Sequence, residues 1–505
     1  MAKRRVFRYT ILMVAVLLLI SAYYYFYCQE QSVCMGVKIL SENEYAQLQY
    51  DESENVEALI LQDDVPVAMD TESATIYIAQ DIDERTYLAE LNGVLSMSNE
   101  EYSLAFAPDD AFVDLYTAMA EGHSFELLIT KAGICCKELQ VVFTNLPVIK
   151  LAGEGDIFTK PGAAGEIVIW TPSDPDIGKY SVKTSYARWH VRGATSRKLD
   201  KKSLKFNLKD ESGNNSNLAL LGMGEDDDWI LNAMATDDLK IREVTVGSVW
   251  EKIQESSLQP YKMACGMYVE VIANDCYQGL YLLQRRIDDK YLELNSNQIL
   301  CKGWSYTPPL DNILEVKYCL YSEDLQKKLA LTYYENHDPE HIQLDNWIDV
   351  NLLVKTCCLA DNGGLSNMYY LWTFQQENYS ISLIPWDTDM AFGYGWVEGN
   401  GVTYLPTIYT SKTLLNRHEY KALKYIYPNL DTIIAERWKQ LRDNGLSAEY
   451  LRDIIELYKN QLVNSGAYKR DMERYGVRNN YADTFEALQI YIDEHFDALD
   501  SYFEY

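Results

Sequence analysis

The stretch LADNGGLSNMYYLWTFQQENYSISLIPWDTDMAFG, residues 359–393, organises the chain. It begins with a polar, glycine-containing segment from Asp361 to Asn367, which is typical of a loop. Two apolar runs follow, Met368–Phe374 and Ile381–Ile384, with a polar turn between them. Strand-like runs on either side of a turn predict a β-hairpin.

Carboxylates stand at both ends of this predicted hairpin. Asp387 and Asp389 follow the second run, directly after Pro385 and Trp386. Hard cations such as Mg²⁺ take oxygen ligands, and phosphoryl transfer needs a carboxylate near the attacking hydroxyl with an Asn and an Asp on the metal. Asp361, Asn367 and Asp387 have these types in this order, although six residues separate Asp361 from Asn367 and the common kinase loop has about five. The alternative is a hairpin whose turns carry acidic caps.

The PWDTDMAFG segment, preceded by the D…N…YYLW block, resembles the spore coat protein H (CotH) kinase family. Members of this family are secreted or surface-bound atypical protein kinases. Further stretches resemble the family in the same order, so that the resemblance covers roughly Leu146 to the C-terminus. They are Arg192–Ser196 followed by Lys201–Phe206, Asp228–Leu231 followed by Lys240–Arg242, and Gly279–Leu283.

The resemblance implies catalytic and metal-binding roles for the central stretch, with ATP and Mg²⁺ (or Mn²⁺) as cofactors. Asp361 would be the base or hydroxyl-orienting carboxylate. Asn367 and Asp387 would hold the metal, and Asp389 is a second candidate ligand. Asp361 and Asp387 are therefore the predicted catalytic residues.

The resemblance also places the nucleotide phosphates near Arg192, Gly193 and Ser196, with Lys202 or Lys205 as the phosphate-binding lysine. In Ser203–Leu208, apolar and polar residues alternate, which predicts a strand with Lys205 facing away from the buried side. The solvated end of a basic strand is the alternative.

Two further features of the family's pattern fall between these stretches. A helix is predicted from about Asp226 to Ile253, with Arg242 matching the family's arginine. The family usually has a glutamate where this chain has Gln284, and an amide cannot supply that charge. Gln284→Glu is then expected to raise ATP turnover.

The N-terminus predicts a membrane anchor. Basic residues in 1–8 precede Tyr9–Tyr27, nineteen residues without charge, which is long enough to span a bilayer as a helix. Because the basic residues come first, we expect a cytoplasmic N-terminus and an extracytoplasmic bulk, at the cell membrane. A cleaved signal peptide is disfavoured, since no small-residue cleavage site follows. Phe26 and Tyr27 argue against a lipid anchor at Cys28.

Composition narrows the class of protein. The 505 residues carry a formal net charge of −30, which argues against nucleic-acid binding and is compatible with cationic partners. The 10 cysteines show no C-x-x-C spacing, so zinc is not indicated. Disulfides and free buried thiols both remain open.

The remaining chain divides into two expected domains. Residues 28–145 are expected to form a β-rich accessory domain, with strands at Val56–Leu61, Ala74–Ala79, Phe125–Thr130 and Leu139–Thr144 and a short helix at Phe112–Glu121. Residues 146–505 are expected to form the kinase-like domain. In its central part, Met267–Ala273 and Gly279–Leu283 predict a hairpin. Its C-terminal helices are expected at 421–427, 431–443, 447–464 and 484–503.

The sequence therefore predicts an α+β, membrane-anchored, extracytoplasmic atypical protein kinase. Its predicted partners are ATP and the Ser or Thr hydroxyls of a cell-surface protein. The alternative is a surface scaffold or adhesion module that kept the fold and lost catalysis, which Gln284 favours. Glycan binding through the many Tyr and Trp residues rests on composition alone.

Overall fold

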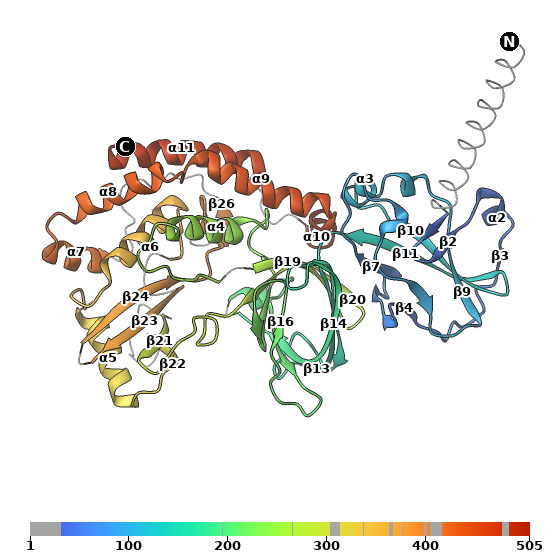
Figure 1. Ribbon diagram of the computed structural model, residues 1–505, viewed down its shortest axis with the longest axis horizontal. Coiled ribbons are helices and arrows are strands. Elements are labelled where there is room, and N and C mark those ends of the chain that lie inside the picture. The colour runs from blue at the N-terminus through green and yellow to red at the C-terminus, as the bar shows by residue number, and fades with distance from the viewer. Residues whose placement is uncertain are drawn as a thin grey trace, which may run out of the picture.

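The computed structural model describes residues 32–193, 195–264, 266–303, 314–336, 338–362, 367–376, 378–397, 401–404, 417–476 and 484–505. These residues form a β-rich part, a closed barrel and a helical part in chain order, a mixture of helix and sheet that agrees with the expected α+β class (Figure 1). The expected tail 1–8, the span 9–27 and Cys28 lie outside the described residues. Within the described ranges, no helix is long and apolar enough to cross a membrane.

The β-rich part contains a mixed sheet of eight strands with its own hydrophobic core. Its strands run in the order β1 (Val33–Cys34), β2 (Val37–Ile39), β9 (Tyr102–Phe106), β10 (Phe125–Lys131), β11 (Ile134–Thr144), β7 (Thr75–Ala79) and β6 (Ala68–Asp70), with β3 (Gln49–Tyr50) beside β11. A smaller sheet contains β5 (Val65–Pro66), β4 (Ile60–Gln62) and β8 (Leu95–Met97). The short helices are α2 (Glu42–Ala46), η1 (Leu88–Glu90), η2 (Asp110–Val113) and α3 (Leu115–Ala120).

Most of the strands expected in this part are confirmed. The expected strand at Val56–Leu61 is wrong over its first four residues, because β4 begins only at Ile60. The expected helix at 112–121 is divided into η2 and α3. The division falls at Asp114, whose side chain accepts from the Thr117 N–H (3.0 Å) and so starts a new helix.

The second part is a closed barrel of seven strands. They follow one another as β12 (Val148–Glu154), β13 (Ala163–Asp174), β14 (Lys179–Val191), β15 (Leu204–Lys209), β18 (Asp228–Asn232), β20 (Cys276–Arg285) and β19 (Gly266–Ala273). The barrel core contains Leu204, Phe206 and Leu208 of β15. Lys205, which lies between Leu204 and Phe206 in the sequence, is only half-buried. The expected alternation in this strand is therefore confirmed, as is the hairpin formed by β19 and β20.

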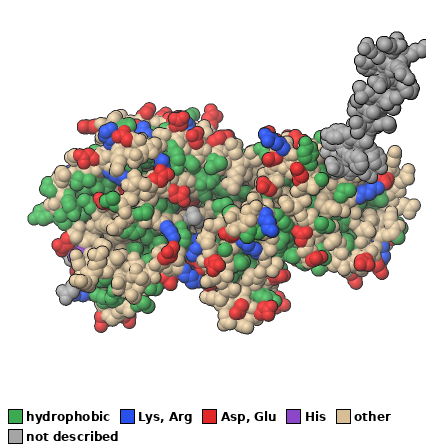
Figure 2. All heavy atoms as spheres, in the orientation of Figure 1, with side chains coloured by type: hydrophobic (Ala, Val, Ile, Leu, Met, Phe, Trp, Pro, Cys, Tyr) green, Lys and Arg blue, Asp and Glu red, His purple; other side chains and the backbone are tan. Residues whose placement is uncertain are grey.

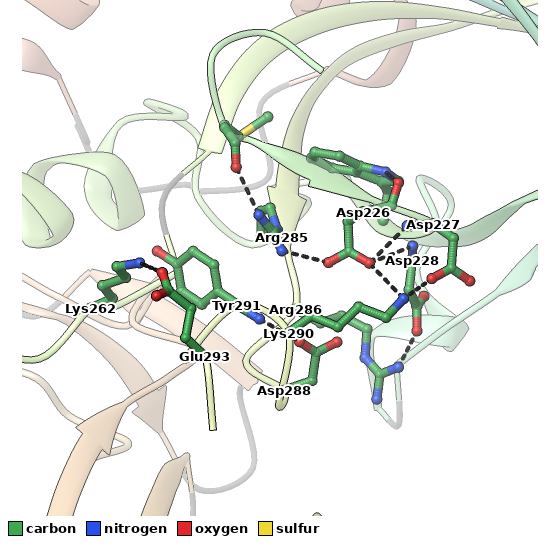
Figure 3. A network of polar contacts seen from close by, with 12 residues as sticks. Asp226, Asp227, Asp228, Lys262, Arg285, Arg286, Asp288, Lys290, Tyr291 and Glu293 are labelled. Atoms are coloured by element: carbon green, nitrogen blue, oxygen red, sulfur yellow. Dashed lines mark hydrogen bonds and ion pairs between the residues drawn. The ribbon is translucent and has the colours of Figure 1, made fainter. Parts of the chain in front are cut away.

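The segment Asp226–Asp228 belongs to strands and not to a helix. β17 (Glu225–Asp226) pairs with β16 (Leu218–Ala219), β18 begins at Asp228, and helix α4 covers only Arg242–Gln254. The expected helical start at Asp226 is therefore wrong. Asp226 is fully buried and accepts from Arg285 Nη2 (2.8 Å), so charge pairing holds this segment to the barrel (Figure 3).

The third part combines a four-stranded sheet with helices. The sheet order is β22 (Leu314–Tyr318), β21 (Gln298–Gly303), β23 (Met368–Gln375) and β24 (Asn378–Pro385). β23 and β24 confirm the hairpin expected in the central stretch. A two-stranded sheet, β25 (Tyr394–Val397) and β26 (Gly401–Tyr404), follows it.

The helices of this part account for most of its core. They are α5 (Glu323–Asn336), α6 (Leu344–Thr356), α7 (Arg417–Ile426), α8 (Leu430–Asp443), α9 (Ala448–Asn464), α10 (Ala467–Tyr475) and α11 (Phe485–Phe503). The four expected C-terminal helices correspond to α7, α8, α9 and α11, and Ser447 caps α9 by accepting from the Tyr450 N–H (3.0 Å). Figure 1 shows α9 extending from this part toward the barrel, with α10 at the junction of the barrel and the β-rich part.

Helix α10 links all three parts through charged contacts. Asp471 is fully buried and accepts from Lys201 Nζ (2.5 Å) and from the Leu280 N–H (2.9 Å). Arg470 pairs with Glu270 of β19 (2.7 Å), and Lys469 donates to the Glu121 carbonyl beside α3 (2.6 Å). No disulfide joins the described cysteines, so the expected alternative of disulfides is not realised among them; they lie at 34, 135, 136, 276, 301, 319, 357 and 358.

A substitution at Gly279 tests whether the Asp471 side chain lies directly against the backbone of β20. The φ of Gly279 is +88°, and a Cβ there would overlap Asp471 Oδ1. We expect Gly279→Ala to destabilise the fold by about 3 kcal/mol, since the left-handed backbone and the overlap both cost energy. The free energy of unfolding measured in urea checks this. Gly213→Ala is the matched control, because Gly213 also has a positive φ (+82°) but nothing lies within 4 Å of its added Cβ. Equal effects of the two substitutions would contradict the proposed overlap.

Candidate functional site

The base of the β23–β24 hairpin brings the two ends of the central stretch together. Met368 pairs with Pro385, and the Trp386 N–H donates to the Asn367 carbonyl (3.1 Å). Asn367 and Asp387, with φ of 53° and 59°, both adopt the left-handed conformation. Asn367 and Asp387 are 20 residues apart in the sequence, but their side chains therefore leave the sheet at the same place.

Two asparagines fix this arrangement. Asn362 is fully buried, and its Nδ2 donates to the carbonyls of Asn367 and Trp386 (both 2.9 Å). Asn367 Nδ2 in turn donates to Asp361 Oδ2 (2.8 Å). Asp361 is thus oriented by Asn367, while Asn362 holds together the two backbone segments that carry Asn367 and Asp387.

The carboxylates at this place repel one another. Burial, and then the charge of Asp387, raises the pKa of Asp361, and the hydrogen bond from Asn367 lowers it in part. Burial and Asp387 also raise the pKa of Asp389 to about 7, although Thr236 Oγ1 donates to its Oδ2 (2.5 Å). Asp387 itself is exposed. The four predicted residues Asp361, Asn367, Asp387 and Asp389 therefore do lie together.

Glu243 of α4 is a further carboxylate at this site that sequence reasoning missed. It is only 8% exposed, and burial followed by Asp387 and Asp389 raises its pKa to about 8. Gln284 Nε2 donates to Glu243 Oε1 (2.8 Å), and Asn232 Nδ2 donates to Oε2 (2.6 Å). An acid in the first turn of a helix is usually a solvated charge, so no sequence pattern indicated that Glu243 is buried.

Two cations stand beside the carboxylates, above the ring of Trp386. The Arg192 guanidinium lies 5.8 Å and Lys302 Nζ 5.6 Å from the Trp386 ring centroid. Burial lowers the pKa of Lys302 to about 8, and Asp387 opposes that shift. Arg192 is a predicted residue, whereas Lys302 of β21 was not predicted, because its strand lies in a stretch without a recognisable motif.

Arg242 joins helix α4 to the loop after Asp389. Its side chain is fully buried, pairs with Asp237 and donates from Nε to the Ala391 carbonyl (3.2 Å). The guanidinium also lies 4.5 Å from the Tyr394 ring centroid. The arginine that the family resemblance selected therefore positions the carboxylate loop from the barrel side.

The predicted phosphate-binding lysines lie apart from the carboxylates in this state. Lys205 pairs with Asp228 (3.0 Å), which also pairs with Arg286 (Figure 3 shows this pair). Lys202 Nζ donates to the Leu199 carbonyl (3.1 Å). Gly193 has a φ of +99°, and Ser196 Oγ occupies the place that a Cβ at 193 would take. Gly193 and Ser196 therefore form one tight turn next to Arg192.

Among the described residues, a separate group with metal-ligand side chains lies between α5 and α6. It consists of Asp338, Glu340 and His341. Asp338 already accepts from Tyr379 Oη (2.6 Å) and contacts His341 Nδ1 (2.6 Å). The carboxylates around Asp387 also accept from neutral donors, but their mutual repulsion raises the pKa values of Asp361 and Asp389, which a bound cation would offset, so they too are a candidate metal site.

A family model described as CotH kinase protein matches residues 189–499. The chain belongs to the CotH kinase family. The matched range contains the whole carboxylate site, from Arg192 through Glu243 to Asp389, and most of the helical part. No curated protein gives a significant match.

A substitution at Gln284 tests the hydrogen bond between Gln284 and Glu243. The expectation that Gln284→Glu raises turnover stays a prediction, but the structure adds a consequence for stability, because a second carboxylate would then face Glu243 at the present 2.8 Å contact. We expect Gln284→Glu to destabilise the protein by roughly 3 kcal/mol, more at pH 9 than at pH 6, because one of the two acids must stay protonated. Urea unfolding measures this. The double variant Glu243→Gln/Gln284→Glu, with one acid and one amide, should recover most of the loss, and no recovery would contradict the pairing.

The carboxylate repulsion predicts a pH dependence of stability. The pKa values of Asp389 and Glu243, about 7 and about 8, lie above their ordinary values of 3.8 and 4.5. The folded state therefore binds more protons than the unfolded state, so this contribution to stability declines as pH rises from about 4 to about 8. Unfolding free energies in EDTA at pH 5 and pH 8 measure the decline. Asp389→Asn should make it smaller, and an unchanged difference would contradict this origin.

Proposed function

We propose that this chain is an atypical protein kinase that transfers the γ-phosphate of ATP to Ser or Thr hydroxyls of an extracytoplasmic or cell-surface protein. One observation carries the proposal. Asp361, Asp387 and Asp389 from the sheet side and Glu243 from the barrel side converge, although their charges repel one another. Such a convergence of acids with raised pKa values is expected at a functional site.

The donor set suits Mg²⁺ (or Mn²⁺). All of these donors are oxygen atoms, which hard cations prefer, and a divalent cation would offset the repulsion that raises the pKa values of Asp389 and Glu243. Asp387 and Asp389 would hold the ion, with Asn367 as the third candidate. When bound, the ion would neutralise charge on the phosphates.

Asp361 would receive or orient the acceptor hydroxyl. Asn367 holds one of its oxygens at 2.8 Å, which fixes the direction of the carboxylate. Its raised pKa makes it a better proton acceptor than an ordinary aspartate. Arg242 and Asn362 would act as positioning residues, because they hold the backbone around Asp387 and Ala391 and need not contact the substrate.

The nucleotide phosphates would lie toward Arg192, at the turn formed by Gly193 and Ser196. Arg192 and Lys302 are the described cations that stack on Trp386, next to Asp387. Lys202 and Lys205 remain candidates for phosphate contacts. In this proposal, phosphate replaces their present partners, the Leu199 carbonyl and Asp228.

A scaffold or adhesion module without catalysis is the second candidate. The pairing of Lys205 with Asp228 favours it, since the lysine expected at the phosphates is occupied elsewhere. The basic residues and the apolar run at the N-terminus support our further proposal that the chain is anchored in the cell membrane with its bulk outside.

Two substitutions separate metal binding from phosphoryl transfer. ATP with Mg²⁺ should raise the thermal unfolding midpoint of the wild-type chain. Asp387→Asn should remove most of this Mg²⁺-dependent shift, because it removes a charged ligand. Asp361→Asn should leave that shift within about twofold of wild type but reduce γ-phosphate transfer at least about a hundredfold, since it removes the group that handles the hydroxyl. The measurements are thermal unfolding and labelling with γ-³²P ATP.

Asp64→Asn is the matched control, because Asp64 is also exposed with a left-handed backbone (φ 65°, against 59° at Asp387) but lies in the β-rich part. It should behave as wild type in both assays. Equal shift and equal labelling for wild type and both site variants would refute the kinase proposal and favour the scaffold.

A further inference from the structure

A basic groove lies at one end of the barrel, beside the carboxylate site. It lies at the loops that join β12 to β13 and β14 to β15. The groove has a volume of ≈ 400 Å³ and is lined by Phe158, Thr159, Lys160, Val191, Arg197 and Lys198. That volume is in the range of ligand-binding pockets in proteins.

The charge of this groove differs from that of the rest of the chain. Three of its six lining residues are cations, whereas the chain as a whole has 75 acidic and 45 basic residues. Figure 2 shows Asp and Glu side chains spread over most of the visible face, with fewer Lys and Arg side chains. Lys202 adds a fourth cation, since its Nζ lies 5.6 Å from the Phe158 ring centroid.

The groove cations are unpaired in the described part of the chain. There, Lys160, Arg197 and Lys198 make no ion pair with a carboxylate, while the neighbouring Lys201 and Lys205 pair with Asp471 and Asp228. Their local field is positive, because Lys205 and Lys160, after burial, lower the pKa of the nearby His190. These cations are therefore available to an anion from outside.

The walls of the groove are fixed by the backbone. Gly162 has a φ of +87°, and a Cβ there would overlap the Trp189 carbonyl oxygen, so the β12–β13 loop lies directly against β14. On the other wall, Gly193 and Ser196 form the tight turn described above. Two loops with defined conformations thus carry the cations that line the groove.

The groove is continuous in sequence with the carboxylate site. Val191 lines it, and the next residue, Arg192, stacks on Trp386, which directly precedes Asp387. A segment bound in the groove could therefore place a neighbouring hydroxyl near the carboxylates.

We propose that this groove binds a phosphorylated segment of the acceptor protein, so that a phosphate already present on the acceptor positions the next hydroxyl. The inference rests on the proposed kinase function. A phosphomonoester carries a charge of about −1.5 to −2 and three acceptor oxygens, which matches the planar donor fork of Arg197 and the ammonium groups of Lys160 and Lys198. The exposed Phe158 ring would pack against apolar groups beside the phosphate. The phosphates of ATP share this chemistry and are the other source to be tested.

Direct binding tests the groove without relying on catalysis. The full-length chain is titrated with a fluorescent peptide of about twelve residues that contains one phosphoserine, and with the same peptide unphosphorylated. We expect the phosphopeptide to bind at least about tenfold more tightly, with an affinity that falls as salt is added. Lys160→Glu/Lys198→Glu should remove this preference.

Lys179→Glu is the matched control, since Lys179 is exposed at the opposite end of the strand β14, whose other end is Val191. It should bind the phosphopeptide as wild type does. Asp387→Asn should also keep phosphopeptide binding, even though it loses the metal-dependent ATP shift. Failure of the kinase proposal, seen with ATP, is therefore distinguishable from failure of the groove proposal.

Two outcomes would overturn the inference. In the first, the wild-type chain does not distinguish the two peptides. In the second, the charge-reversed variant keeps the phosphopeptide preference, and a loss of affinity for ATP with Mg²⁺ in that variant would assign the groove to the nucleotide. If charge reversal lowers the thermal midpoint, Lys160→Gln/Lys198→Gln replaces it in the same titration, and retained phosphopeptide preference in that variant would equally overturn the inference.

Discussion

The buried carboxylate of Asp471 is the constraint on which the arrangement of the site depends. It lies on α10 in the helical part and contacts Lys201 (2.5 Å), Lys240 (3.6 Å) and the Leu280 N–H. A buried charge is tolerated only with partners that match it, so removing any one of these groups leaves the others uncompensated. Lys201 lies in the loop that also carries Arg192 and Ser196, and Lys240 lies two residues before Arg242. One carboxylate thus sets both the loop between β14 and β15, which contains Arg192, and the start of α4.

With the frame fixed in this way, the site can hold groups that repel one another. Burial and mutual repulsion raise the pKa values of Asp361, Asp389 and Glu243, which is unfavourable for the folded state at neutral pH. Hydrogen bonds from Asn367, Thr236 and Gln284 compensate only in part. The repulsion among these acids lowers the stability of the folded state at a place that solvent can reach. A cation bound there would offset the repulsion, which explains why the acids lie together.

The sequence predicted the part of this site that lies close together along the chain. Asp361, Asn367 and Asp387 flank a single hairpin, so two apolar runs with a polar turn between them were sufficient to bring them together. Glu243 and Lys302 come from other elements, and no periodic pattern indicates that a helix acid or a strand lysine faces the same place. The misplaced helix start at Asp226 has a related cause, because an acidic run before apolar residues resembles a helix N-terminus until its partners Arg285 and Lys290 are known.

The same geometry bears on the choice between kinase and scaffold. Resemblance to the family leads one to expect a glutamate at position 284, and its replacement by glutamine favours a scaffold. However, Gln284 donates to Glu243 at 2.8 Å, so a carboxylate from α4 lies next to where the expected one would be. The carboxyl group is supplied from the helix instead of the strand, and it still faces Asp387 and Asp389. A neutral residue at 243 would relieve the repulsion among these acids, so a buried acid at this position is more readily explained by an active site than by a scaffold. Glu243 therefore weighs toward an active site more than Gln284 weighs against it.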